Sequence, residues 1–137
     1  MHCADGASLG DHAEIYNPSP AYLGSHAIVS QQAYVCGATH DYNDPAFPFI
    51  SFPIRLGAYS WVCARASVGP GASLGEGAVL GLGSVATSEL EPWTVYAGVP
   101  ARKVKQRVPR GSSSSADWPP SEGAAEAYSE QVKWNLR

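Results

Sequence analysis

The feature that most constrains this chain is an aliphatic residue that recurs every six residues, with a small residue four positions after it. A period of six matches neither the 3.6-residue period of an α-helix nor a long alternating strand. Because six is a multiple of two, it permits short strands that point the aliphatic residue to one side. The clearer run has its aliphatic positions at Leu56, Val62, Val68, Leu74 and Leu80, and continues more weakly at Ala86.

An earlier run has the same period and then stops. Its aliphatic positions are Leu9, Ile15, Leu23, Val29 and Val35. The step from the second to the third of these is eight, so two residues are inserted in the segment 17–20. After Val35 the repeat is interrupted until Leu56, and this interruption contains residues 40–54, HDYNDPAFPFISFPI. We predict an extended loop at 40–54.

A repeat of this kind is typical of a parallel β-helix. Each aliphatic residue would fill a narrow prism at the middle of a flat face, and the small residue would fit under a corner. Three six-residue units would close one triangular coil, and coils would bury their aliphatic residues by stacking. A β-sandwich is the alternative, but its strands recur at about 8–12 residues. The sequence therefore predicts an all-β fold, a parallel β-helix.

The composition divides the chain into a repeat domain and a tail. Residues 1–107 carry the repeat, and residues 108–137 follow as a linker and tail. The stretch 108–123 is rich in Pro, Ser and Gly, which is typical of a flexible linker. The last residues could form a short amphipathic helix through Tyr128, Val132 and Leu136. We expect the tail to be irregular or to form this short helix.

Charge and cysteine content limit the partners and the compartment. A formal net charge of -3 provides no basic field for nucleic acid or an anionic membrane surface. The three cysteines have no CxxC spacing, which favours a reducing compartment, and Cys36 and Cys63 fall at small hexad positions as packing residues. No apolar run reaches the ~18 residues that a membrane helix needs. We predict a soluble cytoplasmic protein without nucleic-acid or membrane partners.

Three longer motifs carry a resemblance to a known family. They are residues 16–48 (YNPSPAYLGSHAIVSQQAYVCGATHDYNDPAFP), 53–87 (PIRLGAYSWVCARASVGPGASLGEGAVLGLGSVAT) and 91–105 (EPWTVYAGVPARKVK). From about Leu9 to Arg107 the chain resembles the hexapeptide-repeat acyltransferases. Within them it is similar to sugar O-acetyltransferases of the colanic acid biosynthesis group and, more distantly, of the maltose and galactoside group.

This resemblance implies a left-handed β-helix and a homotrimer with active sites at the subunit interfaces. It implies acetyl-CoA as co-substrate and a small-molecule acceptor, a sugar or an exopolysaccharide precursor that is acetylated on a hydroxyl. Members of the family begin with a further N-terminal segment before the point where this chain starts. We therefore expect the chain to be N-terminally short and to lack the part of the acceptor site that this segment builds.

His40 is the expected catalytic residue. Transfer of an acetyl group to a hydroxyl needs a base to take the hydroxyl proton, and neutral imidazole suits this near pH 7. His40 lies where the repeat ends and the predicted loop begins, and it matches the catalytic histidine of the resembled family. The alternative is that His40 only caps a turn.

The expected acceptor-binding residues are Asn17, Asp41 and Tyr42. Asn17 matches an acceptor-binding asparagine of the family, but it could equally be a corner residue in a turn. Asp41 could orient the imidazole or cap the turn that follows it. The aromatic residues of the loop could form an acceptor wall or pack against a neighbouring subunit; they are Tyr42, Phe47, Phe49 and Phe52.

The cofactor-binding residues are expected from the resemblance. Two of the positions are weaker, because relatives often have Ser at Ala64 and Lys at Ser88. Arg102 and Lys105 have a chemical reason of their own, since basic groups suit the 3′-phosphate of CoA; an ordinary solvated charge run is the alternative. The full set is Trp61, Ala64, Leu82, Thr87, Ser88, Arg102 and Lys105.

Other functions remain open at this point. His12, His26 and His40 are evenly spaced by fourteen without a close pair, which disfavours the zinc site of γ-type carbonic anhydrases, and no metal is predicted. Without a nucleophilic cysteine, direct transfer in a ternary complex is favoured over an acyl-enzyme. The alternatives are an N-acyltransferase that acts on an amino sugar and a truncated, catalytically impaired trimer that serves as a scaffold.

Overall fold

A computed structural model describes residues 1–108 and 110. The chain divides into two compact units, Met1–Arg107 and Val108–Arg137, and every strand of the described residues belongs to the first. The predicted linker and short helix in 108–137 fall almost entirely outside the described residues.

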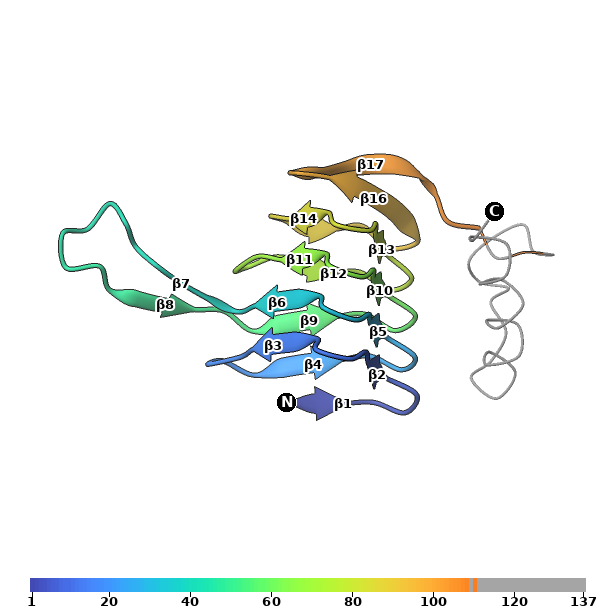
Figure 1. Cartoon of the computed structure of the whole chain (residues 1–137), viewed down its shortest axis with the longest axis horizontal. Coiled ribbons are helices and arrows are strands. Elements are labelled where there is room, and N and C mark those ends of the chain that lie inside the picture. The colour runs from blue at the N-terminus through green and yellow to red at the C-terminus, as the bar shows by residue number, and fades with distance from the viewer. Residues whose placement is uncertain (109, 111–137) are drawn as a thin grey trace. The chain divides into compact units, whose positions relative to one another are not determined.

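The first unit is a parallel β-helix with three sheets, called here faces A, B and C (Figure 1). The chain visits the faces in turn, so strands that neighbour each other in a sheet are about one coil apart in sequence. Face A contains β1 (His2–Cys3), β4 (Ala21–Leu23), β9 (Ile54–Leu56), β12 (Ser73–Leu74) and β15 (Glu89–Leu90). Face B contains β2 (Ser8–Leu9), β5 (Ile28–Val29), β10 (Trp61–Val62), β13 (Val79–Leu80), β16 (Thr94–Gly98) and β17 (Ala101–Gln106). Face C contains β3 (Glu14–Tyr16), β6 (Tyr34–Cys36), β11 (Ser67–Val68) and β14 (Val85–Ala86).

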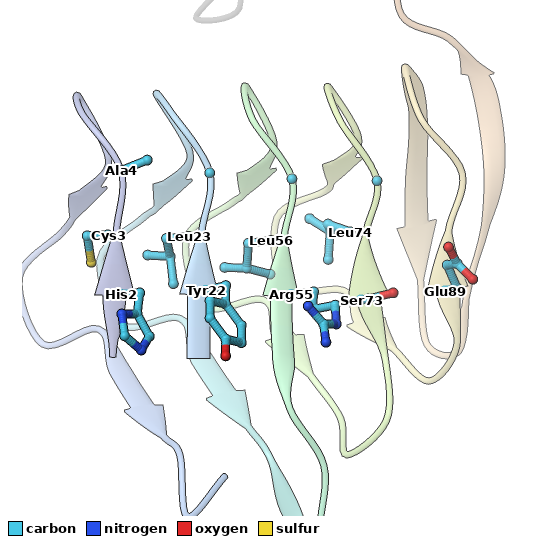
Figure 2. A pocket seen from close by; sticks show the side chains of 13 residues that line it. His2, Cys3, Ala4, Tyr22, Leu23, Arg55, Leu56, Ser73, Leu74 and Glu89 are labelled. Carbon is cyan, nitrogen blue, oxygen red and sulfur yellow. The ribbon is translucent and has the colours of Figure 1, made fainter. Parts of the chain in front are cut away.

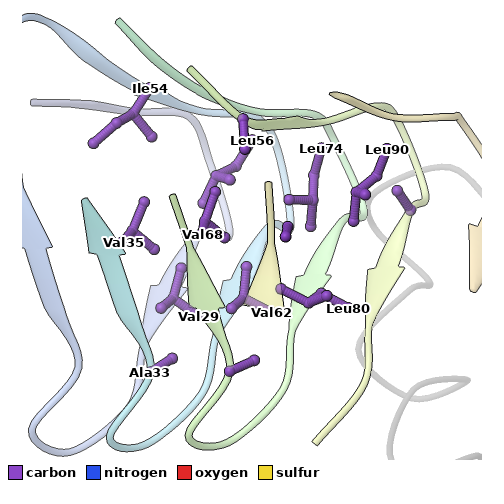
Figure 3. Packing of buried hydrophobic residues seen from close by; sticks show 14 of the residues in the cluster. Val29, Ala33, Val35, Ile54, Leu56, Val62, Val68, Leu74, Leu80 and Leu90 are labelled. Atoms are coloured by element: carbon purple, nitrogen blue, oxygen red, sulfur yellow. The ribbon is translucent and has the colours of Figure 1, made fainter. Parts of the chain in front are cut away.

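The strand register places equivalent positions of the repeat above one another. On face A, Leu23 pairs with Leu56, which pairs with Leu74, which in turn pairs with Leu90. The aliphatic side chains from all three faces meet inside the prism, as Figure 3 shows for Val62 of face B, Val68 of face C and Leu90 of face A. These three are fully buried, and burying a side chain of this size contributes about 1.5–3 kcal/mol. The predicted all-β, parallel β-helix fold is confirmed.

The small residues of the repeat are buried under the corners, as expected. Ala27, Ala66 and Ala78 have no exposed surface. The residue before each of them, at the corner itself, has a positive φ, for example 57° at His26, 57° at Arg65 and 67° at Gly77. A left-handed residue turns the chain sharply from one face to the next. The six-residue period is therefore the length of one short strand plus one left-handed corner.

The corner between faces A and B holds a stack of rings. The His26 ring lies 5.2 Å from that of Tyr59, and the Tyr59 ring lies 6.4 Å from that of Trp93. Arg107 lies over the Trp93 ring and donates hydrogen bonds to the carbonyl oxygens of Tyr59 (2.7 Å) and Gly77 (3.0 Å). The corner histidine His12 is exposed, whereas the corner histidine His26 is half-buried by this stack.

The repeat extends beyond its clear sequence signal at the C-terminal end. Ala86 is fully buried, and the next core positions are Leu90 and Tyr96, which are 1% and 7% exposed. The last coil is followed by the antiparallel pair β16–β17. The phenolic oxygen of Tyr96 accepts a hydrogen bond from the backbone N–H of Glu91 at 3.0 Å, so its one polar atom is paired.

The interruption of the repeat forms a β-hairpin that projects from the coils (Figure 1). Strands β7 (Ala38–His40) and β8 (Phe49–Ser51) pair antiparallel, with Thr39 opposite Ile50. The predicted loop at 40–54 is thus flanked by two paired strands, and the interruption begins two residues earlier and returns to the repeat at Ile54. We call residues 38–51 the hairpin and the rest of Met1–Arg107 the coil stack.

Candidate active site

His40 lies at the end of β7 with an exposed imidazole. Its Nδ1 is 2.7 Å from the carbonyl oxygen of Phe47, and its ring meets the Phe49 ring edge-on with centroids 5.5 Å apart. A carbonyl oxygen can only accept a hydrogen bond, so Nδ1 carries the proton in neutral imidazole. The Nε2 lone pair is then available to accept a proton from another molecule.

The sequence left two roles open for Asp41, orienting the imidazole or capping the turn, and in the structure Asp41 caps the turn. Its Oδ1 accepts a hydrogen bond from the backbone N–H of Asn43 at 3.0 Å. The imidazole of His40 is bonded to the Phe47 carbonyl instead of to this carboxylate. The structure thus assigns the orientation of His40 to a backbone group, which residue types and spacing could not reveal.

The aromatic side chains of the hairpin region face solvent within this chain. Tyr42 is 78% exposed, and Phe47 and Phe49 are 58% and 53% exposed. So much apolar surface on one projecting element is unusual and is typical of a surface that contacts another molecule. Both sequence interpretations, an acceptor wall and packing against another subunit, are compatible with this exposure.

Asn17 lies at the corner from which the hairpin also projects. The two-residue insertion connects β3 to β4, that is face C to face A, and the hairpin connects the same two faces one coil later. The hydroxyl oxygens of Ser19 and Ser51 are 2.6 Å apart, which ties the insertion to the base of the hairpin. Asn17 precedes Ser19 by two residues and is half-buried.

Two of the expected cofactor residues share a hollow at the corner between faces B and C. Ala64 and Leu82 line it, and Leu82 is 76% exposed. Its volume is about 590 Å³, and its other lining residues are Gln31, Gln32, Arg65 and Gly83. The Nε of Arg65 donates a hydrogen bond of 2.7 Å to the side-chain oxygen of Gln32. Sequence reasoning did not single out Arg65 or Gln32.

The remaining cofactor residues lie on face B and at the upper end of the stack. Trp61 points outward from β10 and donates its indole N–H to the Ser30 hydroxyl at 2.8 Å. Thr87 and Ser88 are exposed between β14 and β15, at the corner of the hairpin but higher in the stack. Arg102 and Lys105 are exposed on β17.

The basic stretch of β17 is already partly engaged. Lys103 forms an ion pair of 2.6 Å with Glu91, and Arg107 binds the carbonyl oxygens described above. Within residues 1–108, Arg102 and Lys105 form no ion pair. Arg102 and Lys105, the residues expected to bind a phosphate of CoA, are therefore the basic groups of this strand that face solvent without an ion-pair partner.

One chain does not bring all of the expected residues into one site. His40, Asp41, Tyr42 and Asn17 gather at the corner between faces C and A. Ala64 and Leu82 lie at the corner between faces B and C, and Trp61 lies on face B. The two corners are separated by the width of face C.

Sequence reasoning did not find a second hollow, which lies on the outer side of face A (Figure 2). It has a volume of about 570 Å³ and follows the outward positions of the strands from His2 through Tyr22 and Arg55 to Glu89. The His2 and Tyr22 rings stack at 5.1 Å, and the Arg55 guanidinium lies 5.3 Å from the centre of the Tyr22 ring.

The buried thiol of Cys63 has low reactivity. Burial raises the pKa of the Cys63 thiol to about 12, although the nearby charge of Arg107 acts in the opposite direction. The thiolate is the nucleophilic form, so this side chain is unreactive near neutral pH. Cys36 is half-buried and donates a weak hydrogen bond to the Ala38 carbonyl.

Neither a metal-binding cluster nor a helix able to span a membrane is present among residues 1–108 and 110. No group of three or more His, Cys, Asp or Glu side chains in this part of the chain is arranged to hold a metal ion. In the same residues no helix is long and apolar enough to cross a membrane.

Comparison with known proteins identifies relatives by sequence and by fold. No family model matches the chain. The colanic acid biosynthesis acetyltransferase WcaF of Escherichia coli is 32% identical over 104 residues, which cover 76% of this chain and 57% of WcaF. The chain thus spans little more than half the length of this relative.

Solved structures show the same fold. The hexapeptide-repeat acetyltransferase VCA0836 of Vibrio cholerae superposes with a TM-score of 0.62 and 25% identity, over 77% of this chain and 66% of that one. A variant of the N-acyltransferase AntD of Bacillus cereus, in complex with dTDP-4-amino-4,6-dideoxyglucose and coenzyme A, gives a TM-score of 0.70. It is 20% identical and covers 93% of this chain and 67% of its own, a level that shows fold alone. The chain thus has the left-handed β-helix fold of these hexapeptide-repeat acetyltransferases and is similar in sequence to WcaF.

Proposed function

We propose that this protein is an acetyl-CoA-dependent O-acetyltransferase that modifies a hydroxyl of a sugar or exopolysaccharide precursor. The observation that carries the proposal is the hydrogen bond from His40 Nδ1 to the Phe47 carbonyl, which leaves Nε2 unprotonated on an exposed face. The relationship to WcaF supports the reaction class and the acceptor class.

The reaction would be a direct transfer with His40 as general base. His40 Nε2 takes the proton of the acceptor hydroxyl while that oxygen attacks the thioester carbonyl. The tetrahedral intermediate then expels the thiolate of CoA, which receives the proton from the imidazolium. Asn17, Asp41 and Tyr42 lie on the His40 side and are proposed to border the acceptor.

The proposed co-substrate lies against the other group of residues. Trp61, Ala64 and Leu82 would border the pantetheine arm, and Thr87 and Ser88 would contact the co-substrate from the hairpin corner. Arg102 and Lys105 offer exposed positive charge for its phosphates. AntD is similar in fold and was crystallised with coenzyme A, which supports this ligand class.

The separation of the two groups supports a site built by two copies of the chain, in a homotrimer. A second copy could set the hairpin of one subunit against the hollow of Ala64 and Leu82 in the next. Co-expression tests this: His40→Ala and Leu82→Glu would each be inactive alone, but mixed oligomers should recover part of the activity. Absence of recovery in oligomers shown to contain both variants would contradict a shared site.

The central experiment measures release of free CoA thiol from acetyl-CoA with a panel of sugars. His40→Ala should lower kcat/KM about 10²- to 10⁴-fold, the usual contribution of a general base. His2→Ala is the matched control, because His2 is an exposed histidine on face A outside both groups of residues, and it should keep wild-type activity. Acceptor-dependent release that persists at the wild-type rate in His40→Ala would reject His40 as the base.

An N-acyltransferase that acts on an amino sugar is the second candidate, favoured by the similarity in fold to AntD. The same assay with paired sugars and amino sugars separates the two. An ester product is cleaved by mild alkali, whereas an amide product is stable. A scaffold without activity would release no thiol with any acceptor.

A further inference from the structure

The eight residues that join the two strands of the hairpin form two consecutive turns, each opened by an aspartate. The Asp41 carbonyl accepts the N–H of Asp44 at 3.3 Å, and the Asp44 carbonyl accepts the N–H of Phe47 at 2.9 Å. The Asp44 carboxylate also accepts the N–H of Ala46 at 2.9 Å. Aspartate at the first position of a turn stabilises it by this side-chain bond. The two aspartates therefore fix the course of the backbone up to Phe47.

Phe47 has an uncommon backbone conformation for a residue with a side chain. Its φ is 46°, in the left-handed region that a β-carbon disfavours. Its side chain is 58% exposed, so packing of the ring gives little reason for this conformation. Such conformations persist where the surroundings hold them. Here the holding contacts are the two hydrogen bonds to Asp44 and the bond from Asp41 N–H to the Pro48 carbonyl at 3.0 Å.

The left-handed conformation of Phe47 matters because its carbonyl is the group that accepts from His40 Nδ1. A turn of another shape would aim this carbonyl elsewhere. The imidazole would then lose the contact that selects its tautomer, and the Nε2-protonated form could compete. An Nε2-protonated imidazole has no lone pair at the atom proposed to take the acceptor proton.

We infer that Asp44 is a positioning residue for His40, acting through the Phe47 carbonyl to keep the proton on Nδ1. The inference rests on the proposed function and deepens it. Asp44 is exposed and its carboxylate bonds Ala46 N–H, so it acts on the base through the backbone only.

The first test is kinetic. Asp44→Ala removes the bond to Ala46 and should lower kcat about 10- to 100-fold, part of what loss of the base itself costs, with little change in KM for acetyl-CoA. Asp44→Asn keeps a side-chain oxygen acceptor and should restore most of kcat. Asp5→Ala is the matched control, because Asp5 is an exposed turn aspartate at a different corner. Equal kcat in wild type and Asp44→Ala would overturn the inference.

The second test reads the tautomer directly and does not depend on activity. In ¹⁵N–¹H correlation spectra of the full chain, the His40 signals are those missing from His40→Ala. Wild type should show neutral His40 protonated on Nδ1, and Asp44→Ala should show the Nε2-protonated form. A wild-type His40 protonated on Nε2, or an unchanged tautomer in Asp44→Ala, would overturn the inference even if no acceptor is found.

Substitutions at Phe47 keep the inference testable if Asp44→Ala folds poorly. Phe47→Gly retains the carbonyl and relieves the left-handed backbone, so the Nδ1-protonated form should persist. Phe47→Val places a β-branched side chain at φ 46° and should shift the tautomer. If wild type shows no His40-dependent thiol release while these tautomer shifts occur, the proposed function fails and the positioning role stands.

Discussion

The coil stack and the hairpin are built on opposite principles. In the coil stack, each strand is only a few residues long and is held by ladders to the coils on either side and by buried aliphatic residues. In the hairpin, the two strands pair only with each other, and the aromatic side chains are largely exposed. The first region buries most of the aliphatic residues of its repeat within the chain, whereas the second leaves its aromatic residues largely exposed.

This difference indicates where stability and chemistry reside. Substitutions of buried residues in the stack should act on folding, because each coil packs against the next. Substitutions in the hairpin should act on the proposed reaction, because His40 and the turn that orients it lie outside the core. A rigid scaffold that presents functional groups on a projecting element is a common division of labour.

The largest expected effect is at the centre of the stack. Leu80→Ala should lower the free energy of unfolding by about 2–5 kcal/mol, because Leu80 has no exposed surface and its loss leaves a cavity. Phe49→Ala removes a larger side chain from the hairpin but should change stability by less than about 1 kcal/mol. Denaturant unfolding of the monomeric or dilute protein measures both. Similar losses in the two variants would break the distinction between the regions.

Two corner glycines with nearly equal φ angles test how much the ring stack contributes to stability. Gly77 and Gly83 have φ of 67° and 65°, but an added Cβ would lie 2.3 Å from the Trp93 ring at Gly77 and would meet open space at Gly83. Gly83→Ala should cost about 1–2 kcal/mol, the strain of a left-handed alanine.

Gly77→Ala should cost about 1–3 kcal/mol more than Gly83→Ala, because the ring stack must shift. Thermal or denaturant midpoints of the two variants give the difference directly, since the backbone strain cancels. Equal midpoints would mean that the ring stack accommodates the added methyl group without loss of stability.

The smallest effect concerns the thiols of the stack. Cys3 is exposed on the first strand and should react readily with a thiol reagent at pH 8, whereas Cys63 should react only when the protein unfolds. Because burial raises the pKa of Cys63 from 9.0 to about 12, this thiol favours the folded state below pH 9. That contribution is lost progressively as the pH rises towards 12. Labelling of Cys63 at the rate of Cys3 in the folded protein would contradict its burial.

Much of the stack was predictable because the six-residue period fixes which residues point inward and where the corners fall. Residues such as Val62, Val68 and Leu74 were assigned to the core from period alone, and all are buried. The signal weakened at Ala86, yet the core continues through Leu90 and Tyr96, since pairing with the coil below can tolerate an irregular step. The hairpin was predicted only as a loop, because its strands pair within an interruption that has no period.

The candidate site was less predictable for the same reason. His40 could be selected from its position and chemistry, but the role of Asp41 was left open between orienting the imidazole and capping the turn. Its carboxylate caps the turn, and a backbone carbonyl contacts the imidazole. No residue type encodes the direction of a carbonyl, so sequence had no signal for Phe47.

The sequence by itself determined the architecture, because a period of six forces an inward aliphatic residue and a corner at fixed intervals. It also determined which chemically reactive side chains the chain carries and at which positions of the repeat they lie. Only the tertiary structure decided which of them meet. Hydrogen bonds in the turn 41–48 orient the imidazole of His40, and the course of the coils placed His40 at one corner and Ala64 and Leu82 at another. Such contacts depend on backbone directions and on residues distant in sequence, which composition and spacing do not specify.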